Sequence, residues 1–241
     1  GVLLLLSDST YAELPGYTQS EQAVGETLDH IMANAPGRVI ITTFSSLISR
    51  IQQVIDAAAK HERRVFVVGR SMSDTVRMAL ELGYLSAPDG ILGRLDELRG
   101  LPQDRIVFVT TGSQGEPTSA LVRMGNRDHR QLHIHRGDTI IISATPIPGN
   151  EAVVNRVVDN LFKQGARVLY SKLAPVHVHG HGSQEELKLL LNLVKPKYFM
   201  PIHGEYRHLS LHASLAQSVG IPKDNTFVLE DGDILELGPQ M

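Results

Sequence analysis

The chain has 241 residues, of which 42% are hydrophobic and 20% are charged, and its formal net charge is -3. These values are typical of a soluble globular protein with a sizeable core, and they exclude an overall basic field that would attract nucleic acid. Cysteine is absent, which excludes disulfides, thiolate metal sites and cysteine nucleophiles. Any metal ion must therefore be held by His, Asp or Glu, and eleven histidines are available.

The chain opens on an apolar run, residues 2–6, which is typical of a buried parallel strand. The run is too short for a signal peptide or a membrane span, so we expect neither a targeting segment nor a membrane partner. A start in mid-strand, on Gly rather than Met, indicates that the sequence is a piece of a longer chain.

Strand and helix patterns alternate along the rest of the chain, which favours an α/β fold with a mainly parallel sheet. The tail, residues 226–237, carries an Asp231-Gly232 hairpin signal. Further strands are predicted for residues 38–43, 64–68, 105–110, 138–143, 167–170 and 197–200. Helices are predicted from a cap at Thr18 or Ser20 to residue 35, from Ser45 or Ser46 to residue 58, and for residues 73–82, 150–164, 183–193 and 208–219.

Polar clusters follow five of these strands, at the carboxyl ends where parallel sheets bind their ligands. A single such cluster is also ordinary turn and cap chemistry. Five of them together indicate a binding rim. The clusters are residues 7–10, 42–46, 69–71, 111–116 and 144–151.

The most unusual segment is residues 177–183, in which three histidines alternate with other residues and would share one face of an extended strand. Gly180 and Gly182 would let the backbone approach an anion, and Ser183 would cap a helix whose N-terminus favours phosphate. The segment therefore suits phosphate or a metal ion. The alternative is a surface histidine strand without a role.

His203 and Asp8 complete the candidate chemistry. His203 ends a predicted strand, where it is either a neutral imidazole ligand for a metal ion or a packed histidine. Asp8 ends the first strand, where it is a metal ligand, a helix cap or the partner of a histidine. A carboxylate beside His181 would orient the ring and favour the imidazolium, which could protonate a leaving group.

Taken together, these strings resemble the β-CASP branch of the metallo-β-lactamase nucleases, and most closely ribonuclease J, over essentially the whole chain. The resemblance is carried by residues 5–10, 43–46, 69–72, 111–117, 146–151, 180–188 and 195–207. It implies a Rossmann-like β-CASP domain with a mainly parallel sheet at residues 15–168. Residues 1–14 and 169–241 would be parts of a metallo-β-lactamase domain, an incomplete αββα fold.

The resemblance also implies residue roles. Asp8 would orient His181, which would bind the scissile phosphate or assist the leaving group, and His203 would bind metal. The complete enzyme would use two divalent ions, Zn or Mn, to hydrolyse RNA from a 5′ end, internally, or both. The phosphate site would be lined by Gly180, Gly182 and Ser183, and the RNA would be met by Ser113, Gln114 and Gly115.

The sequence departs from the family in one respect. The His-x-His-x-Asp-His string, a further His and a Gly-Asp ligand are expected before the first β-CASP motif, and they do not occur here. Residues 133–138 look similar, but their spacing is wrong. His203 is then the one expected metal ligand, so we expect this chain alone to be inactive.

Further expectations rest on the resemblance alone. They are an RNA partner, a role in RNA processing and decay that includes rRNA processing, a cytoplasmic location, and a homo-oligomer (dimer or tetramer) for the complete enzyme. Two alternatives stay open: a non-catalytic RNA-binding or scaffold module, and a β-CASP nuclease that acts on DNA or pre-mRNA. A nucleotide-binding Rossmann-like domain is disfavoured, because no Gly-x-Gly-x-x-Gly string follows an early strand.

Overall fold

The computed structural model describes residues 1–147 and 149–238, and the chain divides into two compact units. Unit 1 comprises Gly1–Gln19 and His179–Met241, and unit 2 comprises Ser20–Val178. Pro148, which belongs to the predicted polar cluster 144–151, lies outside the described residues. Among the described helices, none has the length and apolar character that a bilayer crossing requires.

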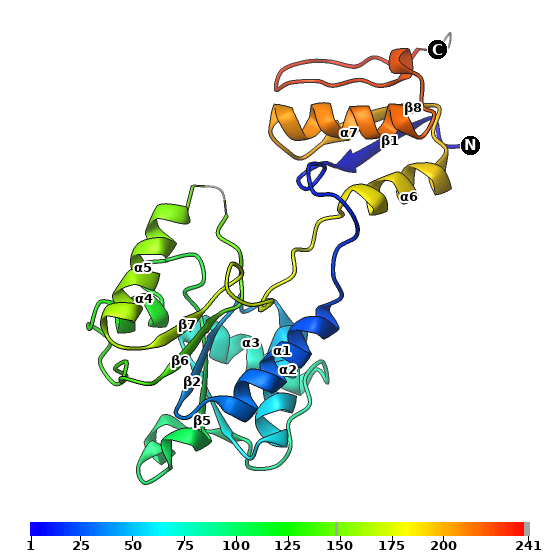
Figure 1. Ribbon diagram of the computed structural model, residues 1–241. Helices are drawn as coiled ribbons and strands as arrows, with labels where there is room; N and C mark the ends of the chain where they lie inside the picture. Colours follow the sequence, from blue (N-terminus) through cyan, green and yellow to red (C-terminus); the bar gives the residue numbers. More distant parts are fainter. Residues whose placement is uncertain (148, 239–241) are drawn as a thin grey trace. The chain divides into compact units, whose positions relative to one another are not determined.

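Unit 2 is built on a six-stranded sheet in the order β4-β3-β5-β2-β6-β7 (Figure 1). Each of its neighbouring strands pairs in parallel, which confirms the predicted α/β fold with a mainly parallel sheet. The strands are β2 (Val39–Thr42), β3 (Arg64–Val68), β4 (Leu92–Gly93), β5 (Ile106–Thr110), β6 (Thr139–Ile142) and β7 (Arg167–Leu169).

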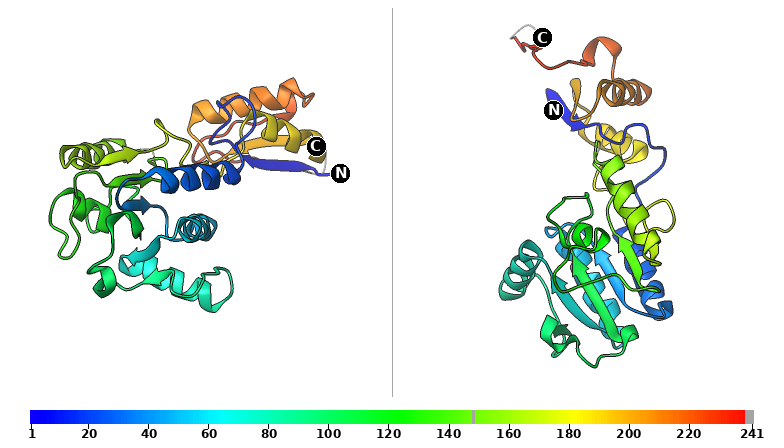
Figure 2. Two further views of the ribbon diagram at one scale, coloured as in Figure 1. Left: turned by 60° about the horizontal axis from the view of Figure 1, so that its bottom comes forward. Right: turned by 90° about the vertical axis from the view of Figure 1, so that its left-hand side faces the viewer.

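Helices cover both faces of this sheet (Figures 1 and 2). Val39 and Ile41 of β2 face the core under α1 to α3, whereas Ile40 faces the core under α4 and α5. Because both faces are buried, the strands are continuous apolar runs rather than alternating ones. The helices are α1 (Glu21–Asn34), α2 (Ile48–Lys60), α3 (Arg70–Glu81), α4 (Ala120–Gly125) and α5 (Glu151–Lys163), with short 3-10 turns η1 (Leu95–Leu98) and η2 (Gln103–Arg105).

A fully buried arginine, Arg50 of α2, joins the first and last segments of unit 2. Its guanidinium donates to the Val176 carbonyl at 2.8 Å and also bonds to Ser143 and Glu21. Glu21 begins α1, whereas Val176 lies near the end of the unit. A buried charge of this kind is tolerated only when its donors are satisfied, as they are here.

Unit 1 pairs β1 (Leu4–Asp8) with β8 (Tyr198–Ile202) in parallel, so that Asp8 lies opposite Ile202. Leu5 and Phe199 pack against Leu191 and Ala216, which belong to the two helices of the unit. Pro201 is tolerated in β8 because a two-stranded sheet leaves one edge of each strand unpaired. The helices are α6 (Gln184–Val194), α7 (Tyr206–Ser218) and the 3-10 turn η3 (Lys223–Asn225).

Several elements differ from the sequence-based predictions. Strand β1 begins and ends two residues later than predicted, which keeps the same side chains on each face. Helix α3 begins at Arg70 rather than at residue 73, because Gly69, with φ of +105°, ends the preceding loop. The Asp231-Gly232 turn forms, but residues 226–238 contain no strand in the structure. Ile234 there is 84% exposed, so little apolar burial supports a hairpin.

The prediction that residues 177–183 form an extended strand is wrong. The segment is irregular, and the boundary between the two units falls after residue 178. The ring of His179 bonds to the carbonyl of His181, so the side chains do not alternate along a strand face. Glycines at positions 180 and 182 favour such an irregular path.

Unit 1 contains a buried histidine, His212, on α7. Its Nδ1 lies 3.0 Å from the Ser9 hydroxyl oxygen, and its ring packs edge-on against Phe199 at 4.8 Å. Burial lowers the pKa of His212 to about 4, although the nearby Asp8 carboxylate acts in the opposite direction. The folded protein therefore holds this histidine neutral.

We predict a pH-dependent loss of stability from His212. In the unfolded chain, His212 binds a proton as the pH falls through ~6.5. The contribution of the neutral, buried His212 to the free energy of unfolding is therefore fully present above that pH and is lost as the pH falls toward about 4. The expected loss in free energy of unfolding is ~3 kcal/mol. Urea unfolding at pH 7.5, 6.0 and 4.5 measures it. His212→Asn should flatten this dependence, whatever its absolute stability, whereas His30→Asn at an exposed position should not. Equal pH dependence in the parent and in His212→Asn would contradict the prediction.

Candidate functional site

Three side chains that are distant in the sequence come together in unit 1. Asp8 is the last residue of β1, His203 follows β8 directly, and His181 lies just before α6. The parallel register that sets Asp8 against Ile202 also brings His203 beside it. One potential ligand atom from each of Asp8, His181 and His203 lies within 4.8 Å of the other two. The structure thus brings together the predicted catalytic and metal-binding residues, although their roles stay predictions.

The side chains of Asp8 and His181 are joined by a hydrogen bond. The Nδ1 of His181 donates to Oδ2 of Asp8, while Oδ1 of Asp8 accepts from the backbone N–H and the hydroxyl of Thr10, each at 2.8 Å. Burial raises the pKa of Asp8, but the hydrogen bonds from Thr10 and His181 outweigh it and hold that pKa below its ordinary value. Asp8 is therefore ionised at neutral pH. It leaves Nε2 of His181 available for another partner.

His203 has an unusual backbone conformation, with φ of +56°. This left-handed region is uncommon for residues other than glycine, and such outliers are found at functional sites. The His203 carbonyl accepts from the Ser9 N–H at 3.4 Å and from the Thr10 hydroxyl at 3.1 Å, which supports the conformation. A side chain at position 204 would meet Cβ of His208 at 2.9 Å, so the close turn after His203 requires Gly204. The His203 ring itself is exposed.

The predicted phosphate-binding residues lie in the turn before α6. Gly180 is exposed, and a Cβ atom added to it would meet nothing within 4 Å, which leaves room for an anion. Ser183 is the N-cap of α6, as predicted, but its backbone N–H already donates to Glu186 at 2.8 Å. Because Glu185 and Glu186 fill the first turn of α6, open space for a phosphate lies at Gly180 and His181 rather than on the helix terminus.

Sequence reasoning missed two residues that hold this turn. Glu186 accepts from the Thr18 hydroxyl at 2.5 Å and from the Ser183 N–H, and these hydrogen bonds hold the pKa of Glu186 below its ordinary value. The pattern Ser183-x-x-Glu186 is a capping-box signature, so Glu186 was detectable from sequence. Thr18 was considered only as a helix cap, although Ser20 caps α1.

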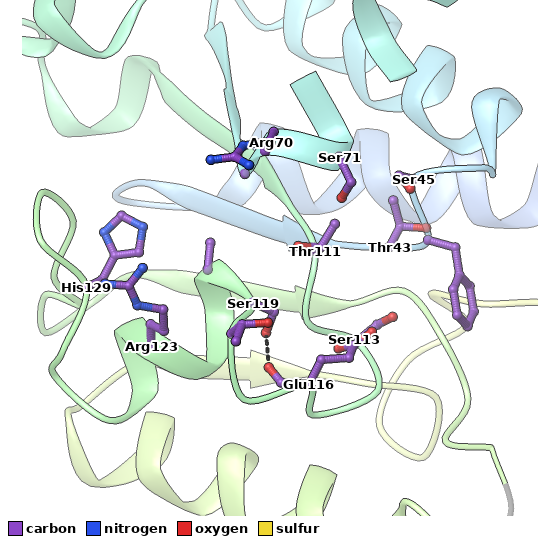
Figure 3. Close-up of a pocket in the computed structure, with 14 residues that line it drawn as sticks. Thr43, Ser45, Arg70, Ser71, Thr111, Ser113, Glu116, Ser119, Arg123 and His129 are labelled. Carbon is purple, nitrogen blue, oxygen red and sulfur yellow. Dashed lines mark hydrogen bonds between the residues drawn. The ribbon is translucent and has the colours of Figure 1, made fainter. Parts of the chain in front are cut away.

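Unit 2 contains a cavity of about 650 Å³ at the carboxyl ends of its strands. Three of the five predicted polar clusters contribute to it, which supports a rim around β2, β3 and β5. Figure 3 shows Arg70 and Ser71 on one side and Ser113, Glu116 and Ser119 on the other. The lining residues are Thr43, Phe44, Ser45, Gly69, Arg70, Ser71, Thr111, Ser113, Glu116, Thr118, Ser119, Ala120, Arg123 and His129.

The cavity carries cationic and hydrogen-bonding groups. Arg70 is exposed, and no described acidic residue forms an ion pair with it, whereas Arg123 lies 3.8 Å from Asp128. Burial, and then the charge of Arg123, lower the pKa of His129. Its Nδ1 accepts from the N–H groups of Gln131 and Leu132, so Nε2 carries the proton and can donate. The arrangement suits an anionic ligand.

The residues predicted to meet RNA have different environments. Ser113 lines the cavity. Gln114 uses both ends of its amide inside the protein, donating to the Thr145 carbonyl at 2.9 Å and accepting from the Ile147 N–H at 2.7 Å. Gly115 has φ of +78°, and a Cβ there would meet Val153 at 2.8 Å. Gln114 and Gly115 therefore shape the loop that presents Ser113.

The string 133–138, which looks like a metal motif, has a structural role. Asp138 is buried and accepts from Arg38 through both carboxylate oxygens, at 2.9 and 2.5 Å. It also accepts from the backbone N–H of His135 at 2.7 Å. A carboxylate with these partners is not available to a metal ion.

The Asp8, His181 and His203 group is the one cluster among the described residues whose ligand atoms are close enough to hold a metal ion. Carboxylate and imidazole donors suit divalent ions such as Zn²⁺ and Mn²⁺. Open coordination of two ions needs more ligands than this cluster supplies. The residues therefore fit part of a metal site.

The chain matches two families of known proteins. The family described as "Ribonuclease J, beta-CASP domain" matches residues 36–161. The family described as "Zn-dependent metallo-hydrolase RNA specificity domain" matches residues 168–227 and so includes His181 and His203.

Similar curated proteins carry the same name. The chain is 48% identical to "Ribonuclease J" of Synechocystis sp. and 49% identical to "Ribonuclease J" of Thermus thermophilus, in each case over 98% of its own length. It is 46% identical over its full length to "Ribonuclease J2" of Bacillus subtilis. The chain spans 37%, 41% and 43% of the length of these three proteins, respectively. The chain belongs to the ribonuclease J family.

Proposed function

We propose that this chain is the part of a metal-dependent ribonuclease that contributes the β-CASP domain and one side of the hydrolytic site. The convergence of Asp8, His181 and His203 within 4.8 Å carries this proposal, in a chain that is 46–49% identical to proteins named ribonuclease J. The reaction is phosphodiester hydrolysis in RNA.

His181 acts on the phosphate or on the leaving group. Asp8 holds Nδ1 of the ring, so Nε2 faces the substrate and donates a proton or a hydrogen bond. The charge of Asp8 stabilises the imidazolium that this role requires. Gly180, Gly182 and Ser183 give the turn before α6 the shape that admits the phosphate.

His203 would hold a metal ion, with Asp8 as its neighbour in the cluster. Two divalent ions, Zn or Mn, would supply hydroxide near neutral pH and neutralise charge in the transition state. The described residues offer too few ligands for two ions, so this chain depends on ligands from another segment. Without them it would act as an RNA-binding module.

The cavity of unit 2 would bind the sugar-phosphate backbone of RNA. Arg70 and Arg123 supply positive charge, and Ser113 supplies a hydroxyl. Because the net charge of -3 gives no overall attraction for RNA, a local basic groove of this kind would have to supply it.

The domain assignment follows from this function. Residues 15–168 would form the β-CASP domain, and residues 1–14 and 169–241 would belong to the metallo-β-lactamase domain. Compact unit 2, Ser20–Val178, and the match at residues 36–161 support a β-CASP domain in this region. A cytoplasmic location, rRNA processing and a dimer or tetramer of the complete enzyme are proposed from the family resemblance.

One prediction of this function concerns the three converging residues in a version of the protein that carries the complete metal site. His181→Ala should lower kcat for RNA hydrolysis by ~10²–10⁴-fold, because a positioned proton donor is lost. Asp8→Asn should also lower kcat. His203→Ala should reduce the amount of bound metal, which atomic absorption measures. His30→Ala, an exposed histidine on α1, is the control and should be unaffected. Full activity in His181→Ala would refute the proposed role.

A further prediction concerns the cavity. Arg70→Ala should weaken binding of a 5′-monophosphorylated single-stranded RNA about tenfold. It should also reduce the slope of log binding constant against log salt concentration by ~0.7 per lost phosphate contact. Fluorescence anisotropy at several salt concentrations measures both quantities. Arg77→Ala is a matched control, because Arg77 lies on the same helix but pairs with Asp74 outside the cavity. Equal losses in the two variants would indicate a general charge effect instead of a site.

A further inference from the structure

Four aromatic rings lie in series, two of them in the proposed hydrolytic site and two next to it. The ring of Tyr11 lies 4.0 Å from the ring of His179, between centroids, at an interplanar angle of 31°. Tyr11 also lies 5.5 Å from His181, and His181 lies 5.7 Å from His203. All four residues belong to unit 1. Neither Tyr11 nor His179 belongs to the cluster of potential metal ligands.

The position of Tyr11 is set by the turn that follows Asp8. The Thr10 N–H donates to the Asp8 carboxylate, and the Ala12 N–H donates to the Ser9 carbonyl at 3.0 Å. This is an Asx-type turn, in which the carboxylate fixes the backbone two residues later. The same Asp8 that pairs with His181 therefore also places Tyr11 against it.

His179 restrains the backbone at His181. Its Nδ1 donates to the His181 carbonyl at 2.8 Å across Gly180. Gly180 has no neighbour within 4 Å of an added Cβ atom, so packing around that residue does not hold the segment. The ring of Tyr11, which packs at a tilt against the His179 ring, supports this hydrogen bond from the side.

We propose that Tyr11 and His179 form a positioning pair for His181, a role that rests on the proposed function of that histidine. The hydrogen bond to Asp8 fixes the direction of Nδ1 but tolerates tilting of the imidazole about that bond. Ring packing from Tyr11 restricts the tilt, and His179 restricts the backbone. Together they direct Nε2 of His181 toward one place on the phosphate.

The ring of Tyr11, and not its hydroxyl, carries this role. No described residue hydrogen-bonds to the Tyr11 hydroxyl in the structure, whereas the ring contacts two histidines. Phenylalanine should therefore replace tyrosine, and leucine should not. This difference separates positioning from proton transfer by the phenol.

The test uses the protein with its complete metal site and compares Tyr11→Phe, Tyr11→Leu and His179→Ala. Tyr11→Leu and His179→Ala should each lower kcat for RNA hydrolysis ten- to a hundredfold, roughly the cost of a misplaced catalytic group, with KM within about twofold. Tyr11→Phe should stay within about twofold of the parent. The double variant Tyr11→Leu/His179→Ala should lose less than the product of the single losses, because the two residues act as a unit.

A second measurement reports on the orientation of the His181 ring directly. The Nδ1–H resonance of His181, observed by NMR, should be sharp in the parent and in Tyr11→Phe, and broadened in Tyr11→Leu. Unchanged hydrolysis in His181→Ala would show that the proposed function is wrong, and the resonance alone then decides the positioning role. A resonance in Tyr11→Leu as sharp as in the parent, or a kcat equal to that of Tyr11→Phe, would overturn the proposal.

Discussion

The parallel pairing of β1 with β8 is the constraint on which the candidate site depends. It joins residues 4–8 to residues 198–202 and places Asp8 opposite Ile202, so that His203 emerges beside Asp8. A parallel pair needs a crossover between its strands, and here the crossover contains the whole of unit 2 and α6. Shifting this register by one residue would turn Asp8 to the opposite face and disperse the cluster.

Unit 2 also uses a parallel sheet, and its functional groups line a cavity at the ends of the strands. Its strands are buried on both faces, so their polar chemistry is confined to the ends, where the cavity lies. Gly69, with φ of +105°, begins α3 at Arg70 and thereby places Arg70 and Ser71 at the edge of this cavity. In both units, functional groups therefore lie at strand termini, as Asp8 and His203 do in unit 1, although His181 precedes α6.

Much of this arrangement could be predicted from the sequence, because apolar runs and ordered motifs are local signals. The alternation of strands and helices was correct, and the motifs that include Asp8, His181 and His203 led to residues that the structure brings together. The alternating histidines led to the wrong prediction of an extended strand at residues 177–183. Periodicity cannot reveal that the His179 ring bonds to the carbonyl of His181. Tyr11 and Thr18 were missed as site residues because their partners lie more than 160 positions away, at His179 and Glu186.

We propose that this chain holds one side of a metal-dependent ribonuclease site. The most direct measurement is hydrolysis of a 5′-monophosphorylated, end-labelled RNA with Mn²⁺ or Zn²⁺, by this chain and by a version that carries an upstream His-x-His-x-Asp-His segment. We expect hydrolysis by the extended version alone. Hydrolysis by this chain alone that disappears in His203→Ala would contradict the requirement for metal ligands from another segment. No hydrolysis by either protein would favour a binding module.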